Sequence, residues 1–120
     1  MRKTVLIVDD HAGFRRMARR VLEASGLTVV GEAEDAASAI IAARMLDPDL
    51  VLLDVLLPDS DGFAVAEALA QSCGRARVIL TSSREFEDLR TRLTETSACG
   101  FIAKRDLSGE ALIAIAARRP

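Results

Sequence analysis

The sequence predicts a single α/β domain in which five parallel strands form a doubly wound sheet with helices on both faces. Short aliphatic and β-branched runs alternate five times with longer segments of helical periodicity along the 120 residues. Two of the runs are apolar at nearly every position, as expected for central strands that are covered on both faces. Because no repeat or linker interrupts this alternation, residues 1–120 are expected to be one domain.

The first strand and helix follow from the hydrophobic pattern near the N-terminus. TVLIV (4–8) indicates a buried strand. Apolar residues then recur at intervals of three and four, which predicts an amphipathic helix that ends at Gly26. The residues expected on its inward face are Phe14, Met17, Ala18, Val21 and Leu22.

The second unit combines the strand LTVVGEA (27–33) with a helix. Asp35 is a favourable N-cap for this helix, which continues through Arg44 and is closed off by Pro48. LVLLD (50–54) then predicts a third strand, as apolar as the first.

The rest of the chain predicts two further units. Pro58 and Gly62 mark a loop before the third helix, and Ser108 is a suitable cap for the last one. Two of the helices have an apolar face, formed by Phe86, Leu89 and Leu93 in one and by Leu112, Ile115 and Ala116 in the other. The expected elements are a helix over 63–72, a strand over 76–82, a helix over 85–96, a strand over 99–104 and a helix over 108–118.

Composition limits the classes of protein that the chain can belong to. The formal net charge of −2 gives no overall basic field that would attract nucleic acid. Cys73 and Cys99 fit no metal or redox spacing, which indicates ordinary thiols in a reducing compartment. The apolar run near the N-terminus is too short for a signal peptide, and no stretch is long enough to cross a membrane. The sequence therefore predicts a cytoplasmic protein without a membrane partner.

Polar residues stand at the end of four of the five expected strands. Asp9 and Asp10 follow the first strand, Asp54 ends the third, Thr81 lies near the end of the fourth, and Lys104 ends the fifth. Each has a local explanation, because Asp and Thr cap helices and a lysine can be a solvated surface charge. Parallel strands, however, bring their carboxyl ends to one edge of the sheet, where ligands bind. A shared site at this edge accounts for all these residues together.

The residue types at this edge suit phosphoryl chemistry with a metal ion. Clustered carboxylates, expected to have no His or Cys nearby, favour a hard divalent cation such as Mg²⁺, which would relieve the repulsion between Asp9 and Asp10. Asp54 could then act as a nucleophile toward a phosphoryl group. Lys104 would help to cancel the charge on the phosphoryl oxygens; only two of the sixteen cationic side chains are Lys, and its compact ammonium suits that role better than an Arg fork.

Taken together, these motifs resemble those of receiver domains in two-component response regulators. The matching segments are VLIVDD (5–10), DLVLLDVLLPDSDG (49–62), VILTSS (78–83) and GFIAK (100–104), and the resemblance covers the whole chain. It implies a flavodoxin-like fold with strand order 2-1-3-4-5 and five helices. VVGEAEDAASAI (29–40) and GFIAKRDLSGEAL (100–112) are further similar to the NarL/FixJ-type subfamily, which implies a link to transcription regulation.

The resemblance also implies a role for each site residue. Asp54 would be the phosphoacceptor, and Mg²⁺ would be held by Asp9, Asp10, Asp54 and the backbone carbonyl of Leu56. Thr81 would be the switch hydroxyl, moving together with Phe101 at an aromatic switch position, and Lys104 the ionic partner of the phosphoryl group. The chain is therefore expected to be a signalling domain and not an enzyme in its own right.

Partners are implied in the same way. The phosphoryl donor would be a histidine kinase or a phosphotransfer protein. A homodimer could form through helix four, strand five and helix five, or through helices one and five. DNA would be a partner only through a C-terminal helix-turn-helix domain, and the sequence does not decide between a stand-alone receiver and a part of a longer regulator.

Three departures and two alternatives accompany this interpretation. Arg105 stands where many family members have Pro, which puts a cis peptide there in doubt, and Leu56 and Ser83 border the site without a strong acid or base, so the phosphoryl lifetime stays open. A Mg²⁺-dependent phosphatase with an Asp nucleophile would usually need a carboxylate where Leu56 stands. A degenerate receiver that serves only as a scaffold is disfavoured by the complete set of site residues.

The first helix also carries a row of basic side chains. Arg15, Arg16, Arg19 and Arg20 could form a solvated face, or they could border a surface on which a kinase docks. Both interpretations stay open at the level of sequence.

Overall fold

A computed structural model of the chain describes residues 3–72, 75–83 and 96–117. Its strands form one parallel five-stranded sheet in the order β2-β1-β3-β4-β5, which confirms the predicted class and strand order. The elements are β1 (Thr4–Val8), α1 (Ala12–Ala24), β2 (Thr28–Ala33), α2 (Ala36–Leu46), β3 (Leu50–Asp54), α3 (Gly62–Ser72), β4 (Arg77–Ser82), β5 (Gly100–Ala103), the 3₁₀ turn η1 (Lys104–Asp106) and α5 (Gly109–Ala116).

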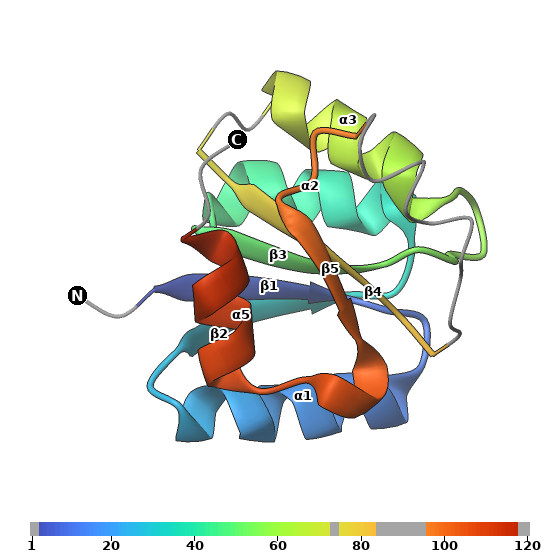
Figure 1. Cartoon of the computed structure of the whole chain (residues 1–120). Helices are drawn as coiled ribbons and strands as arrows, with labels where there is room; N and C mark the ends of the chain where they lie inside the picture. Colours follow the sequence, from blue (N-terminus) through green and yellow to red (C-terminus); the bar gives the residue numbers. More distant parts are fainter. Residues whose placement is uncertain (1–2, 73–74, 84–95, 118–120) are drawn as a thin grey trace.

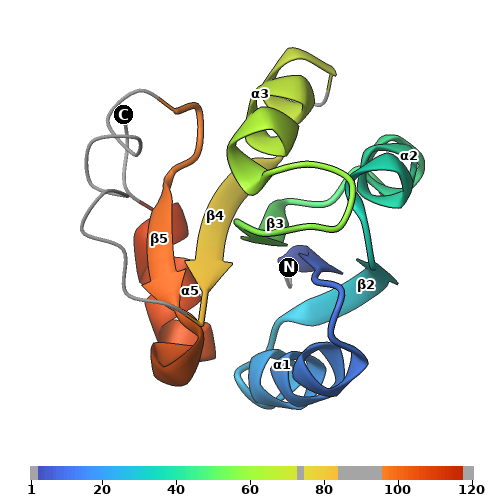
Figure 2. The ribbon, with the colours of Figure 1, turned by 90° about the vertical axis from the view of Figure 1, so that its right-hand side faces the viewer.

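The described residues contain four α-helices, two on each face of the sheet. α2 and α3 cover one face, while α1 and α5 cover the other (Figures 1 and 2). The helix expected over 85–96 lies outside the described residues, apart from its last position. The arrangement is the doubly wound one that the alternation of strand and helix patterns predicts.

Alternation of side chains along each strand builds a separate aliphatic core on each face. In β1, Leu6 and Val8 pack with α2 and α3, whereas Val5 and Ile7 pack with α1 and α5. All four are completely buried. Successive side chains of β1 point to opposite faces of the sheet, and helices cover both faces. The strand is therefore apolar at consecutive positions and lacks the apolar–polar alternation of a half-exposed strand.

Helix ends largely follow the predicted caps. The side chain of Asp35 accepts a hydrogen bond from the Ser38 amide at 2.8 Å, and that of Ser108 accepts one from the Ala111 amide at 3.0 Å. Gly26 follows α1 with a φ of 91°, a conformation that a residue without a Cβ adopts at little cost.

Two local expectations need correction. Met17 was expected on the inward face of the first helix, but its side chain is 39% exposed, because the buried stripe of α1 is narrow and centres on Ala18 and Leu22. The fifth strand is also shorter than expected, since the backbone turns into η1 at Lys104. No cis peptide bond occurs in the described residues, including those around Arg105.

Candidate phosphoacceptor and metal site

The polar residues predicted to share one edge of the sheet do lie together there. Asp9 directly follows β1, Asp54 is the last residue of β3, and Thr81 pairs with Asp54 in the register of β3 and β4. Lys104 follows β5 as the first residue of η1. Asp9 and Thr81 are completely buried and Asp54 is 5% exposed, so charged and polar groups at this edge are shielded from solvent.

Lys104 is the cation that holds the buried carboxylates together. Its Nζ lies 2.6 Å from Asp9 Oδ2 and donates a hydrogen bond to Asp54 Oδ2 at 3.2 Å. The same ammonium lies 4.4 Å from the centroid of the Phe14 ring, a favourable cation–π geometry. The predicted ionic role of this lysine therefore already has a counterpart in the protein without a phosphoryl group.

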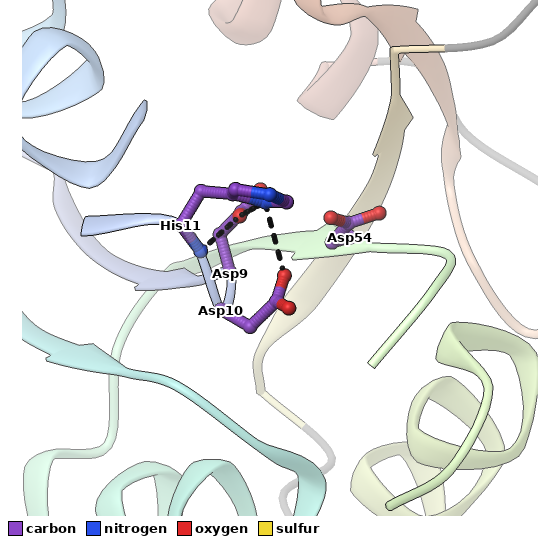
Figure 3. A group of neighbouring side chains, drawn as sticks. All are labelled: Asp9, Asp10, His11 and Asp54. Carbon is purple, nitrogen blue, oxygen red and sulfur yellow. Dashed lines mark hydrogen bonds and ion pairs between the residues drawn. The ribbon is translucent and has the colours of Figure 1, made fainter. Parts of the chain in front are cut away.

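The side chains of Asp10 and His11 face solvent. Asp10 is 40% exposed, and its Oδ1 lies 3.2 Å from Nδ1 of His11, which also lies 3.4 Å from Asp9 Oδ1 (Figure 3). The expectation that no histidine lies near the carboxylates is wrong. Its signal was present in the sequence, because the only His of the chain directly follows Asp10.

Four side chains at this edge could hold a metal ion. One ligand atom from each of Asp9, Asp10, His11 and Asp54 lies within 4.8 Å of the others. Asp54 approaches the group from β3, while the other three residues belong to the segment between β1 and α1 (Figure 3). A donor set dominated by carboxylate oxygens fits a hard divalent cation.

Burial and charge shift the proton affinities of the two central groups. Burial raises the pKa of Asp54; the negative charge of Asp9 adds to this effect, while the Leu56 amide and Lys104 oppose it. For Lys104, burial is the largest single influence and lowers the pKa, but the carboxylates of Asp9 and Asp54 together outweigh it and raise the pKa above its usual value. The lysine therefore stays charged, and the carboxylate of Asp54 is held in an environment that disfavours its negative charge.

Backbone contacts fix the position of Asp9. Its amide donates to the Ala33 carbonyl of β2 at 3.0 Å, and its carbonyl accepts a hydrogen bond from the Arg15 guanidinium at 2.6 Å. Arg15 is held in turn by Glu32, with 3.0 Å between Nε and Oε1. The carboxylate Oδ1 accepts a hydrogen bond from the His11 amide at 2.9 Å.

The segment after β3 is packed closely against Asp54. The Leu56 amide donates to Asp54 Oδ1 at 3.0 Å, whereas the Leu56 side chain is 51% exposed and contributes no acid or base. Gly62 lies so near that a Cβ there would come within 2.6 Å of the Asp54 carbonyl oxygen. Asp59, in the same loop, accepts hydrogen bonds from the Ala36 and Ala37 amides at the start of α2.

The two residues expected to act as a switch lie beside the site in different surroundings. Thr81 Oγ1 is buried and has no hydrogen-bond partner among the described residues. A hydroxyl in this state loses the hydrogen bonds that water would give it, so a new acceptor nearby would be favourable. Phe101, on β5, is partly buried and packs against the core cluster on the α2 and α3 face.

The row of basic side chains on α1 divides into two pairs. Arg15 and Arg19 both contact Glu32 of β2, with Arg19 Nη2 lying 2.9 Å from Oε2. Arg16 and Arg20 are exposed. Half of the row therefore serves to fasten α1 to the edge strand.

Known proteins with the same arrangement are response regulators. A family model described as the response regulator receiver domain matches residues 5–116. CheY of Bacillus subtilis is 34% identical over 104 residues, which cover 87% of this chain and 87% of CheY. NarL of Escherichia coli is 35% identical over 112 residues, which cover 92% of this chain and 51% of NarL. The chain thus spans about half the length of that regulator.

A solved structure supports the same conclusion. The receiver domain of a NarL response regulator from Mycobacterium tuberculosis is 32% identical, covers 98% of both chains and superimposes with a TM-score of 0.88. Among the described residues, no helix combines the length and the hydrophobicity needed to span a bilayer. The chain belongs to the response regulator receiver domains of two-component signalling systems, and its relatives include the NarL-type regulators.

Proposed function

We propose that Asp54 accepts a phosphoryl group from the phosphohistidine of a histidine kinase or phosphotransfer protein, in a reaction that depends on Mg²⁺. The observation that carries this proposal is the cluster of Asp54 with Asp9, Asp10 and Lys104 at the carboxyl edge of the sheet. An Asp54 oxygen would form the new P–O bond while the P–N bond of the donor breaks, and the imidazole would leave with the bonding electron pair.

Each neighbouring residue has a proposed task in this transfer. Asp9, Asp10, Asp54 and the carbonyl of Leu56 would hold the Mg²⁺, which neutralises charge on a phosphoryl oxygen when it is bound. Lys104 would turn from the carboxylates toward the phosphoryl group, because esterified Asp54 no longer carries a negative charge. Its flexible stem and three donors suit this change of partner.

The proposed response starts at Thr81. Its unpartnered Oγ1 would donate a hydrogen bond to a phosphoryl oxygen, and Phe101 would move with it. The signal would then pass to a surface that includes β5 and α5, where an effector or a second copy of the chain could bind; the expected fourth helix of this surface lies outside the described residues. α1 with α5 is the other proposed dimer surface. DNA would be reached only through a separate domain of a longer regulator, and the proposed setting is the cytoplasm.

The alternative of a phosphatase is weaker because of Leu56. A phosphatase with an Asp nucleophile would usually carry an acid or base two residues after it, and the exposed aliphatic side chain of Leu56 cannot transfer a proton. The exposed Ser83 is likewise no strong acid or base. We therefore propose that any loss of phosphate from Asp54 is self-hydrolysis within a signalling domain.

Intact-mass analysis after incubation with Mg²⁺ and acetyl phosphate tests the proposal. We expect one phosphoryl adduct that alkali removes, and none in Asp54→Asn. Asp59→Asn is the matched control, because Asp59 lies in the same loop but binds α2, and it should keep the adduct. An equal adduct on Asp54→Asn, or undiminished labelling in a metal chelator, would refute the assignment.

A further inference from the structure

We infer that His11 makes this site a mixed nitrogen and oxygen site that binds divalent transition-metal ions, such as Zn²⁺ and Co²⁺, more tightly than Mg²⁺. The inference extends the proposed metal site by naming an additional ligand and the class of ion that this ligand selects. Its starting observation is that the imidazole of the only His in the chain faces the two carboxylates that precede it (Figure 3).

The side chain of His11 does not cap α1, although the residue stands at the N-cap position. His11 is the N-cap residue of α1, where Ser, Thr, Asp or Asn commonly accept hydrogen bonds from the first helical amides. Its side chain makes no such bond. The ring instead turns back toward Asp9 and Asp10 and remains 73% exposed, so an ion and its water ligands can reach Nδ1.

The distances between the candidate ligand atoms match those around one metal ion. Two atoms that are each about 2.1 Å from a metal ion lie about 3.0 Å apart in right-angled coordination and about 3.4 Å apart in tetrahedral coordination. His11 Nδ1 lies 3.2 Å from Asp10 Oδ1 and 3.4 Å from Asp9 Oδ1. The three atoms can therefore bind one ion with little rearrangement.

The buried carboxylate of Asp9 contacts Lys104 through one oxygen and presents the other to His11. Asp9 is completely buried, and the ammonium of Lys104 lies 2.6 Å from its Oδ2. A buried carboxylate gains from a further cation on its other oxygen. That oxygen, Oδ1, is the one that faces the imidazole.

The ligand preference of each ion then determines which ions His11 helps to bind. Imidazole is a good ligand for Zn²⁺ and neighbouring transition metals, whereas Mg²⁺ prefers oxygen and retains its water. Replacing one water ligand by His11 should therefore strengthen the binding of Zn²⁺ and Co²⁺ and do little for Mg²⁺.

Calorimetric titrations with Zn²⁺ and with Mg²⁺ test the inference. They are carried out in a Cys73→Ser, Cys99→Ser background so that thiols do not contribute. The parent should bind Zn²⁺ at least about tenfold more tightly than Mg²⁺. In His11→Ser the ratio of the two affinities should fall at least about tenfold. Serine is chosen because it is a good N-cap, so that α1 keeps its start.

A second measurement identifies the ligand directly. Proton NMR of the Co²⁺ complex should show strongly shifted signals of a single coordinated imidazole, and these should be absent from His11→Ser. An unchanged affinity ratio in His11→Ser, or a Co²⁺ complex without shifted ring signals, would overturn the inference and leave His11 as a partner of the carboxylates alone. The Mg²⁺-dependent adduct on Asp54 of the parent tests the proposed function separately, so the two can fail independently.

Discussion

Lys104 shows how a single residue can serve both the fold and the site. Asp9 and Asp54 are carboxylates that the sheet buries side by side, and the ammonium of Lys104 lies within 3.2 Å of an oxygen of each. Neighbouring buried negative charges would otherwise oppose folding. The lysine therefore stabilises the buried carboxylates, and in the proposed function it would also contact the phosphoryl group.

Removing this cation should expose the cost of the buried carboxylates. Lys104→Ala is expected to lower the free energy of unfolding in a metal chelator by about 3 kcal/mol, and Lys104→Met, which restores most of the volume, by nearly as much. Millimolar Mg²⁺ should restore part of the lost free energy of unfolding in both variants. Urea unfolding curves provide the measurement. If Lys104→Met is as stable as the parent in the chelator, then volume and not charge is what Lys104 contributes.

At the scale of elements, hydrogen bonds between Thr4 and Asp49 connect β1 with β3. Asp49 precedes β3, and its Oδ2 accepts hydrogen bonds from the Thr4 amide at 2.9 Å and from the Thr4 hydroxyl at 3.1 Å. The Asp49 amide donates back to Thr4 Oγ1 at 2.9 Å. This reciprocal set fixes the register at the amino ends of the two central strands, and so supports the relative positions of Asp9 and Asp54 at their other ends.

These bonds give stability a defined dependence on pH. The Thr4 backbone bond is the largest influence that holds the pKa of Asp49 below its usual value, although burial opposes it. The ionised side chain therefore contributes stability above the pKa of the unfolded chain, about 3.9, and this contribution is lost as the pH falls through the lower folded value.

Asp49→Asn should therefore be less stable than the parent by about 1 kcal/mol at pH 7. The difference should shrink as the pH falls below about 4. Thermal melts of both proteins between pH 3 and pH 7 measure it, with Glu34→Gln, at an exposed position directly after β2, as a control. A difference that is the same at every pH would contradict the role given to the charge.

At the scale of the whole molecule, binding of an ion at the metal site should raise the thermal stability of the protein. An ion that binds only the folded protein stabilises it by mass action, by about 1.4 kcal/mol at ten times its dissociation constant. For a domain of this size that corresponds to a rise of roughly 5 °C in Tm. Asp10→Asn should abolish most of this rise. It should also melt higher than the parent in a chelator, because one repelling carboxylate is gone.

Calorimetric scans of both proteins with Mg²⁺ and with a chelator check this expectation. An unchanged Tm of the parent at high Mg²⁺ would contradict the metal site. An equal rise in Asp10→Asn would instead show that the ion binds elsewhere on the molecule.

The sequence predicts most of the architecture because each element carries its own local signal. The apolar runs of β1 and β3, the caps at Asp35 and Ser108, and the polar residues at the ends of four strands can be predicted from the sequence alone. The strand order came from the family resemblance, since periodicity does not say which strands are neighbours. The roles proposed for Asp54, Thr81, Phe101 and Lys104 remain predictions.

Features that depend on side-chain direction could not be predicted in the same way. The exposure of Met17 depends on how narrow the buried stripe of α1 is, and helical spacing alone does not give its width. The turn of His11 toward Asp10 depends on the backbone at the N-cap of α1. Likewise, the sharing of Glu32 by Arg15 and Arg19 depends on how α1 sits against β2.

The sequence separation within the site has a consequence for how the protein is made. Lys104 and Asp54 are 50 residues apart, and the partners are brought together only through parallel strand pairs joined by crossovers. Contacts of this kind form late in folding, because the entropy of closing a long loop is lost before the contacts can stabilise the chain. A nascent chain whose fifth strand is still inside the ribosome therefore has an acidic edge without its lysine. In the proposed function Lys104 contacts the phosphoryl group, so we expect that contact to become possible only after the fifth strand has left the ribosome.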